Sequence, residues 1–283
     1  MALHLSKDDI DDHVISKIIN EFVPTIAIIR YAHGTFSNRK AERVASSEGS
    51  YLPVHLLVVL NGSHSKGNEA NLISAMENKL LRITKSTVLI HSLDFVNEGL
   101  SRGQDFFIDI IEKGIAIYKS DAFLLTTYFR IHPRLKLGHI KKTYNNFHLK
   151  GAEFLKLAYI AYSKFNIHIS VFLLHQSTEL LMRNILITHT DYDPKIHNLR
   201  RLITYCNHVA PQINRIFFPK WNDPLVDNID FNLLQESYIQ ARYKLEYHID
   251  KKSVRRLLTK AKKLERLSSV LQGRLCTKLS AQF

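Results

Sequence analysis

The sequence predicts an α+β protein in which a small mixed α/β sheet domain is followed by an all-α helical bundle. Short β-branched runs alternate with helical patterns up to about residue 125, whereas after Pro133 apolar residues recur at helical spacing. Charge divides the chain in the same way, because residues 1–130 hold 14 Lys or Arg against 15 Asp or Glu, and residues 131–283 hold 25 against 11. We expect an α/β domain over 1–125, a linker over 126–144 and a bundle of four or five helices over 145–283.

The first domain begins with a helical pattern over residues 8–22, which Pro24 ends. Runs rich in Val and Ile predict strands, and the segments between them predict helices. The expected strands are 25–31, 54–60, 87–91 and 114–118, and the expected helices are 68–83, 92–100 and 106–111. Strands that alternate with helices favour a layered α/β sheet.

The second half predicts helices over residues 151–165, 170–188, 197–206, 232–249 and 251–275. The last of these helices is strongly basic. Its cations include Lys251, Lys252, Arg255, Arg256, Lys260, Lys262, Lys263 and Arg266. An excess of positive charge this large within one domain favours a polyanion such as RNA or a nucleotide as partner.

Several protein classes are disfavoured by composition. Cys206 and Cys276 are far apart and form no metal-binding pair, and the 15 histidines show no zinc spacing. The acidic N-terminus lacks a secretory pattern, and the least charged stretch, residues 165–178, is too short to cross a bilayer. We therefore expect a cytoplasmic protein with no membrane association, no metal site and no cofactor.

The segment YAHGTFS at residues 31–37, followed by the strand VHLLVVL at 54–60, resembles a minimal nucleotidyltransferase domain. That family has a strand, a Gly-Ser turn and a second strand that begins Asp-x-Asp, whose carboxylates hold magnesium. Here Gly34-Thr35 replaces the turn, and Pro53 and His55 stand where the aspartates belong. The resemblance implies a degenerate domain that serves as scaffold, partner surface or nucleotide holder, without nucleotidyl transfer.

A second resemblance covers roughly residues 145–275. The segments FLLHQSTELL at 172–181, HNLRRLI at 197–203 and SYIQARY at 237–243 resemble, in order and spacing, the signature helices of a HEPN domain. HEPN domains commonly accompany minimal nucleotidyltransferases. The resemblance implies an α-helical bundle that is often dimeric, and we expect a homodimer through the bundle.

The same resemblance implies candidate site residues. Many HEPN domains cut RNA through Arg-x(4–6)-His, a spacing that Arg242 and His248 satisfy, with the arginine holding a phosphate and the histidine moving a proton. On one straight helix these two side chains would be about 120° and 9 Å apart, so a kink or a second protomer would have to bring them together. The other candidate binding residues are Lys244, Tyr243, Tyr247, Glu179, His175, Arg255 and Arg256.

Three functional interpretations remain open at the level of sequence. The preferred one is binding of RNA or a nucleotide through the basic bundle. The first alternative is a metal-independent, toxin-like ribonuclease that uses Arg242 and His248. The second is a non-catalytic dimerisation or interaction protein, in which Arg242 forms a structural ion pair with Glu179 or Glu246.

Overall fold

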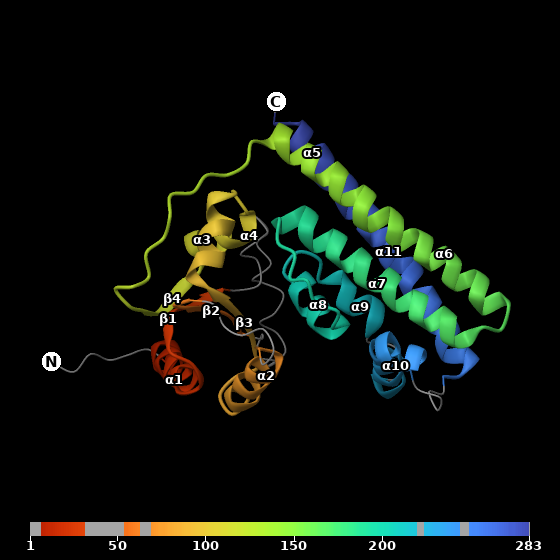
Figure 1. Cartoon of the computed structure of the whole chain (residues 1–283), viewed down its shortest axis with the longest axis horizontal. Helices are drawn as coiled ribbons and strands as arrows, with labels where there is room; N and C mark the ends of the chain where they lie inside the picture. The colour runs from red at the N-terminus through yellow and green to blue at the C-terminus, as the bar shows by residue number, and fades with distance from the viewer. Residues whose placement is uncertain (1–6, 32–53, 63–68, 220–223, 244–248, 283) are drawn as a thin grey trace. The chain divides into compact units, whose positions relative to one another are not determined.

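The computed structural model describes residues 7–31, 54–62, 69–219, 224–243 and 249–282, with backbone alone for 7–11 and 241–243. The chain divides into two compact units, Met1–Arg130 and Ile131–Phe283. The first unit contains a mixed sheet with helices, and the second contains helices and no strand among its described residues (Figure 1). The predicted fold class is therefore confirmed.

The sheet of the first unit has four strands in the order β3-β2-β1-β4. The strands are β1 (Thr25–Tyr31), β2 (Val54–Leu60), β3 (Ser86–Ser92) and β4 (Ile115–Lys119). β1 runs antiparallel to both β2 and β4, whereas β2 and β3 are parallel. β1 and β2 are buried along almost their whole length, which explains their continuous apolar sequences.

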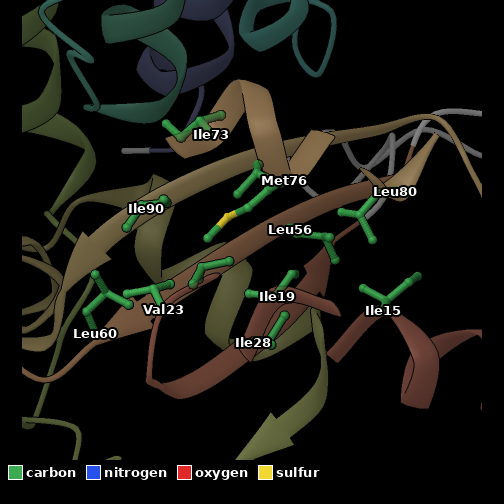
Figure 2. Packing of buried hydrophobic residues seen from close by; sticks show 12 residues of the cluster. Ile15, Ile19, Val23, Ile28, Leu56, Leu60, Ile73, Met76, Leu80 and Ile90 are labelled. Atoms are coloured by element: carbon green, nitrogen blue, oxygen red, sulfur yellow. The ribbon is translucent and has the colours of Figure 1, made fainter. Parts of the chain in front are cut away.

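Helices cover both faces of this sheet (Figure 1). α1 (Lys7–Phe22) and α2 (Glu69–Leu80) lie on one face, and α3 (Leu93–Ser101) and α4 (Asp105–Lys113) lie on the other. Figure 2 shows Ile19 of α1 and Met76 of α2 in the core with Leu56 of β2, all fully buried. Because successive side chains of a strand point to opposite faces of the sheet, each strand contributes side chains to the packing on both sides.

The first unit ends in an ion-pair cluster. The guanidinium of Arg130 bonds Asp105 at 3.1 Å, Asp109 at 2.8 Å and Glu112 at 2.5 Å, all on α4. These bonds hold residue 130 against α4, at the point where the chain leaves the unit.

The second unit is built around one long helix, α7 (Ile167–Thr190). Its buried residues occur on all sides, which explains why its sequence lacks a polar face. The surrounding elements are α5 (Pro133–Thr143), the π-helical turn η2 (Tyr144–His148), α6 (Leu149–Ser163), α8 (Leu199–Cys206), α9 (Gln212–Phe217), α10 (Pro224–Tyr243) and α11 (Lys251–Ser280). α6, α8, α10 and α11 all pack on α7.

A buried polar network ties α7 to α11 and η2. Ser268 Oγ accepts a hydrogen bond from Asn184 Nδ2 at 3.0 Å and lies 3.0 Å from Nδ1 of His148. Burial lowers the pKa of His148 below its usual value. Such a network fixes the register of the three elements, because any slip would leave a polar group without a partner.

Most element bounds differ from the predicted ones by a few residues, and the largest differences lie in the second unit. The range assigned to a linker, 126–144, contains α5, whose buried Lys136 and Ile140 pack it into the second unit. α9 was not predicted, and α10 begins at Pro224 rather than at residue 232.

Of the helices described, none combines the length and apolar character needed to span a bilayer.

Candidate functional site

The predicted catalytic pair is only partly described. Arg242 and Tyr243 lie in the last turn of α10, but their side chains are outside the described residues. Lys244, Tyr247 and His248 are also outside that set, as are Gly34, Thr35 and Pro53 of the predicted nucleotidyltransferase pattern. The Arg242 and His248 mechanism and the pairing of Arg242 with Glu179 therefore stay predictions.

The other predicted residues lead to a carboxylate–imidazole pair. Glu179 is on α7, and its side chain is only 5% exposed. Nδ1 of His197 lies 3.0 Å and 3.1 Å from its two carboxylate oxygens. The His197 ring itself is 56% exposed, so the pair connects the interior of the bundle with solvent.

Tyr238 of α10 supports this imidazole from one side. The rings of His197 and Tyr238 stack with centroids 4.8 Å apart and an interplanar angle of 12°. Beside them is an open groove of about 450 Å³. It is lined by His197, Asn198, Gln235, Glu236, Tyr238, Ile239 and Gln240. The groove thus offers an aromatic ring, amides, a carboxylate and an imidazole to a ligand.

The segment between α7 and α8 is held in place close to His197. Arg183, one turn beyond Glu179 on α7, forms two bonds to the carboxylate of Asp193, at 2.9 Å and 2.6 Å. The same guanidinium lies 3.4 Å from Glu179. Asn198 then caps α8 by accepting a hydrogen bond from the backbone N–H of Arg201 at 2.9 Å. His197 therefore lies between two fixed points, the Arg183–Asp193 ion pair and the Asn198 cap.

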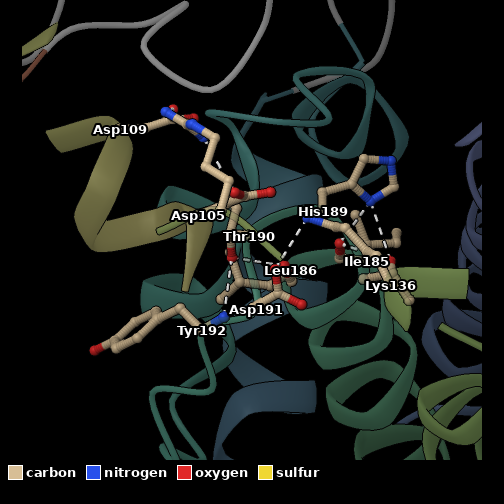
Figure 3. Close-up of polar contacts among 11 residues, drawn as sticks. Asp105, Asp109, Lys136, Ile185, Leu186, His189, Thr190, Asp191 and Tyr192 are labelled. Atoms are coloured by element: carbon tan, nitrogen blue, oxygen red, sulfur yellow. Dashed lines mark hydrogen bonds and ion pairs between the residues drawn. The ribbon is translucent and has the colours of Figure 1, made fainter. Parts of the chain in front are cut away.

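The beginning of this segment is also anchored (Figure 3). Lys136 Nζ pairs with Asp191 at 3.0 Å, and the backbone N–H of Tyr192 bonds the hydroxyl of Thr190. Asp191 and Lys195 adopt φ values of 57° and 51°, a region that residues other than glycine enter rarely. Surrounding bonds must hold such a backbone, so the segment has one defined path.

The predicted binding residue His175 lies behind the pair, fully buried one turn before Glu179 on α7. Its Nδ1 is 3.9 Å from the Glu179 carboxylate, and its ring centroid is 5.2 Å from that of Tyr238. The structure thus brings together His175 and Glu179, two of the binding residues that the sequence suggested. Because His175 is buried, it supports the site and does not line the groove.

The basic helix α11 has two very different faces. Its buried face is mostly apolar and includes Val254, Leu257, Ala261 and Leu264. Six exposed cations share another face, because their positions follow the 3.6-residue helical repeat. They are Lys252, Arg255, Lys263, Arg266, Arg274 and Lys278. We call these six residues the α11 ridge. At 1.5 Å per residue, the ridge extends over roughly 39 Å.

Other cations of α11 are committed to internal ion pairs. Arg256, a predicted binding residue, bonds the fully buried carboxylate of Asp230 at 2.6 Å and 2.7 Å. These bonds raise the pKa of Arg256 above its usual value. Lys260 is buried and donates to Phe217 O at 2.7 Å and to Asp227 at 2.5 Å. Arg255 belongs to the ridge, whereas its neighbour Arg256 links α10 to α11.

The first unit offers no comparable constellation in its described residues. His55, which stands at one of the missing aspartate positions, is buried with its ring 5.7 Å from that of Tyr31. Across the described part of the chain, no group of three or more His, Cys, Asp and Glu side chains could hold a metal ion. The nucleotidyltransferase resemblance of this unit stays a prediction.

These features define a protein with an all-α unit, which carries a buried carboxylate paired with an exposed imidazole and a cationic helix, joined to a small sheet unit. Residues 146–270 match the family model of the HEPN domain. The second unit is therefore similar to the HEPN domain over these residues, in agreement with the resemblance of the three signature helices. The search among curated proteins gave no match.

Sequence reasoning missed the role of His197. That residue was recognised as part of a helix pattern but not as a site residue, because its partner Glu179 is far away along the chain. The signal that could have found it is the sequence His-Asn at the start of a predicted helix. Asn198 is an expected N-cap, which places the preceding residue, His197, just before the first turn of the helix.

Proposed function

We propose that this protein binds RNA through its HEPN unit, with the α11 ridge as the main phosphate-contacting surface. The observation that supports it is the alignment of six exposed cations along one helix face. The one acid of α11, Glu265, pairs with Lys262 and lies off the ridge. A row of this length matches several consecutive phosphates better than it matches a single nucleotide.

Two aspects of the preferred interpretation belong to the same proposal. The N-terminal unit is a catalytically degenerate nucleotidyltransferase-like partner of the HEPN domain, supported by the buried His55 at the start of β2. The second aspect is a homodimer. α6 supports it, because Leu149, Leu157 and Ile160 are exposed along one face.

The charges beside this α6 face fit a second copy of the chain. Glu153 and Lys156 lie next to the apolar residues, and Nζ of Lys156 is 3.6 Å from Oε1 of Glu153. In a twofold-symmetric contact Glu153 of one protomer would pair with Lys156 of the other, and the reverse, because such an interface must be complementary to itself. The dimer therefore accounts for the apolar residues and for the charges around them.

Binding of a fluorescein-labelled single-stranded RNA, measured by anisotropy over a series of salt concentrations, tests the RNA proposal. With six ridge cations engaged, the slope of log K against log salt is expected to be about −4, from roughly −0.7 per neutralised phosphate. The triple variant Lys263→Gln, Arg266→Gln, Arg274→Gln should reduce the magnitude of this slope to about 2 and weaken binding.

A matched control removes the same number of charges elsewhere. Lys17, Arg82 and Lys85 are exposed on the first unit, so their triple replacement by Gln lowers the net charge equally. It should leave most of the RNA affinity intact. Equal weakening by both triple variants would show that net charge alone drives binding and would contradict a role for the ridge. Undetectable RNA binding at low salt would refute the proposed function.

A further inference from the structure

We propose that the turn between α6 and α7 binds an unpaired base of RNA, which stacks on the ring of Phe165. We call Lys164, Phe165 and Asn166 the hairpin tip. The inference rests on the proposed RNA binding and deepens it, because it names single-stranded RNA as the ligand class and places one base on one residue. Phe165 is outside the set of site residues that the sequence suggested.

Phe165 has a backbone conformation that is rare for its residue type. Its φ is 60°, in the left-handed region that glycine favours. The backbone N–H of Phe165 donates to Tyr162 O at 3.1 Å, and that of Asn166 donates to Ala161 O at 2.9 Å. Glycine usually occupies this position after the end of a helix. A bulky aromatic residue is strained here, and strained residues cluster where side chains bind ligands.

The Phe165 side chain is held in place without being buried. The residue is 73% exposed, so it contributes little to the core of the bundle. Nζ of Lys251, the first residue of α11, lies 3.9 Å from the centroid of the Phe165 ring and 5.4 Å from that of Tyr162. The ammonium group covers one face of the Phe165 ring and restricts its orientation. The opposite face is open to solvent, and a base would stack on that face.

The surroundings of the ring are cationic. Lys164 precedes Phe165 in the turn and is exposed. On α11, Lys251 is followed by Lys252 and Arg255, the first two residues of the α11 ridge. Arg255 lies about 6 Å beyond Lys251 along the helix axis, at 1.5 Å per residue. A strand whose phosphates follow the ridge would therefore reach the ring at its first end. Aromatic rings beside a positively charged track are typical of sites for single-stranded nucleic acids.

The acid at this end of α11 does not oppose the cations. Asp250 caps the helix, because its carboxylate accepts hydrogen bonds from the backbone N–H groups of Lys252 and Ser253, at 2.8 Å and 2.9 Å. Since these N–H groups already have an acceptor, a phosphate would bind the side chains of the ridge and not the helix N-terminus.

A single exposed ring selects a ligand by its strandedness. Every base has an aromatic face, so stacking is largely independent of sequence. In a duplex the faces of the internal bases are covered by their neighbours, whereas the bases of a single strand can turn outward onto a protein ring. The hairpin tip should therefore add affinity for single strands and none for duplexes, while the ridge attracts the phosphates of both.

The test compares a fluorescein-labelled single-stranded RNA with the duplex of the same strand and its complement, by anisotropy on the full chain. Phe165→Gly removes the ring and gives the left-handed backbone its preferred residue, so the melting temperature should not fall. This variant should bind the single strand about tenfold more weakly. Its affinity for the duplex and its salt slope should stay unchanged, because the ring contacts no phosphate. Phe165→Trp keeps a stacking ring and should bind the single strand at least as tightly as the wild-type protein.

A matched control removes a second exposed aromatic ring. Phe129 is 63% exposed and belongs to the first unit, so Phe129→Gly should bind both RNAs like the wild-type protein. Unchanged single-strand affinity in Phe165→Gly would overturn the inference, as would an equal loss of affinity for the single strand and the duplex. A lowered melting temperature of Phe165→Gly would also overturn it, because the ring would then serve the packing of the bundle.

The outcomes distinguish this inference from the proposed function. If the wild-type protein binds RNA and Phe165→Gly binds it equally well, the stacking site is refuted and RNA binding by the ridge stands. If neither RNA binds at low salt, the proposed function fails, and the stacking site fails with it. Sedimentation with vesicles of phosphatidylcholine and phosphatidylserine tests a lipid surface as ligand. Vesicle binding that needs Phe165, together with RNA binding that does not, would overturn the inference and assign the hairpin tip to lipid.

Discussion

Glu179 and His197 meet through a hydrogen bond of 3.0 Å between a buried carboxylate and a half-exposed imidazole, although they belong to different elements of the bundle. Glu179 is on the central helix α7, and His197 immediately precedes the capping residue of α8. The contact depends on the anchored segment between those helices. The contact between Glu179 and His197 and the packing of the bundle are thus maintained by the same bonds.

The adjacent residues Arg255 and Arg256 should respond to substitution in opposite ways. Arg255→Ala removes a ridge cation and should weaken RNA binding with little change in stability. Arg256→Ala leaves the fully buried Asp230 without its guanidinium and should destabilise the second unit by about 2–3 kcal/mol. Thermal melting and RNA anisotropy on both variants check this, and equal effects on stability would contradict the assignment.

Lys260 should be essential for stability and not for binding. Lys260→Met leaves the carboxylate of Asp227 buried without its ammonium group, so the free energy of unfolding should fall by about 3–5 kcal/mol. Lys263→Met, an exposed ridge position on the same helix, serves as the control and should change stability by less than about 0.5 kcal/mol. Urea unfolding followed by circular dichroism provides the measurement. A similar loss for the two variants would show that the Lys260 pair is not the cause.

The first unit should lose stability in mild acid because of His91. Burial lowers the pKa of His91 to about 4, below the ordinary value of 6.5, so the unfolded chain binds a proton more readily than the folded one. Stability from this group is present above pH 6.5 and is lost as pH falls toward 4, by about 2 kcal/mol between pH 7 and pH 5.

His91→Phe removes this titration and keeps the ring that stacks on Phe95 at 4.4 Å. Hydrogen exchange of β3 peptides, corrected for intrinsic rates, should show a smaller loss of protection between neutral and mildly acidic pH in His91→Phe than in the wild-type protein. His13→Gln, which changes an exposed imidazole of α1, should behave like the wild type. An unchanged pH dependence in His91→Phe would contradict the role of this imidazole.

The proposed homodimer should depend on the exposed face of α6. Leu157→Glu places a charge in the apolar face and should shift the protein to monomers in sedimentation velocity, because each dimer would bury two such charges. Leu135→Glu, at an exposed apolar position of α5, is the control and should sediment like the wild-type protein. A wild-type protein that is monomeric at all concentrations would refute the dimer.

The charge asymmetry and the order of strands and helices followed from the sequence, because periodicity and composition are local properties of the chain. The strands 25–31 and 54–60 were predicted with the bounds that the structure has. The three segments that resemble HEPN helices were also visible, since each lies within one helix or at its start. α5 was missed because its few buried residues, among them Lys136, give no apolar pattern.

Only the tertiary structure decided which of these residues act together. Arg255 and Arg256 look alike in a basic run, and the packing of α10 on α11 alone places Asp230 beside one of them. His197 likewise gains its carboxylate partner only when the segment after α7 folds back along the bundle. Sequence patterns report the neighbours of a residue along a helix or strand, whereas ion pairs and sites depend on contacts between elements that periodicity does not encode.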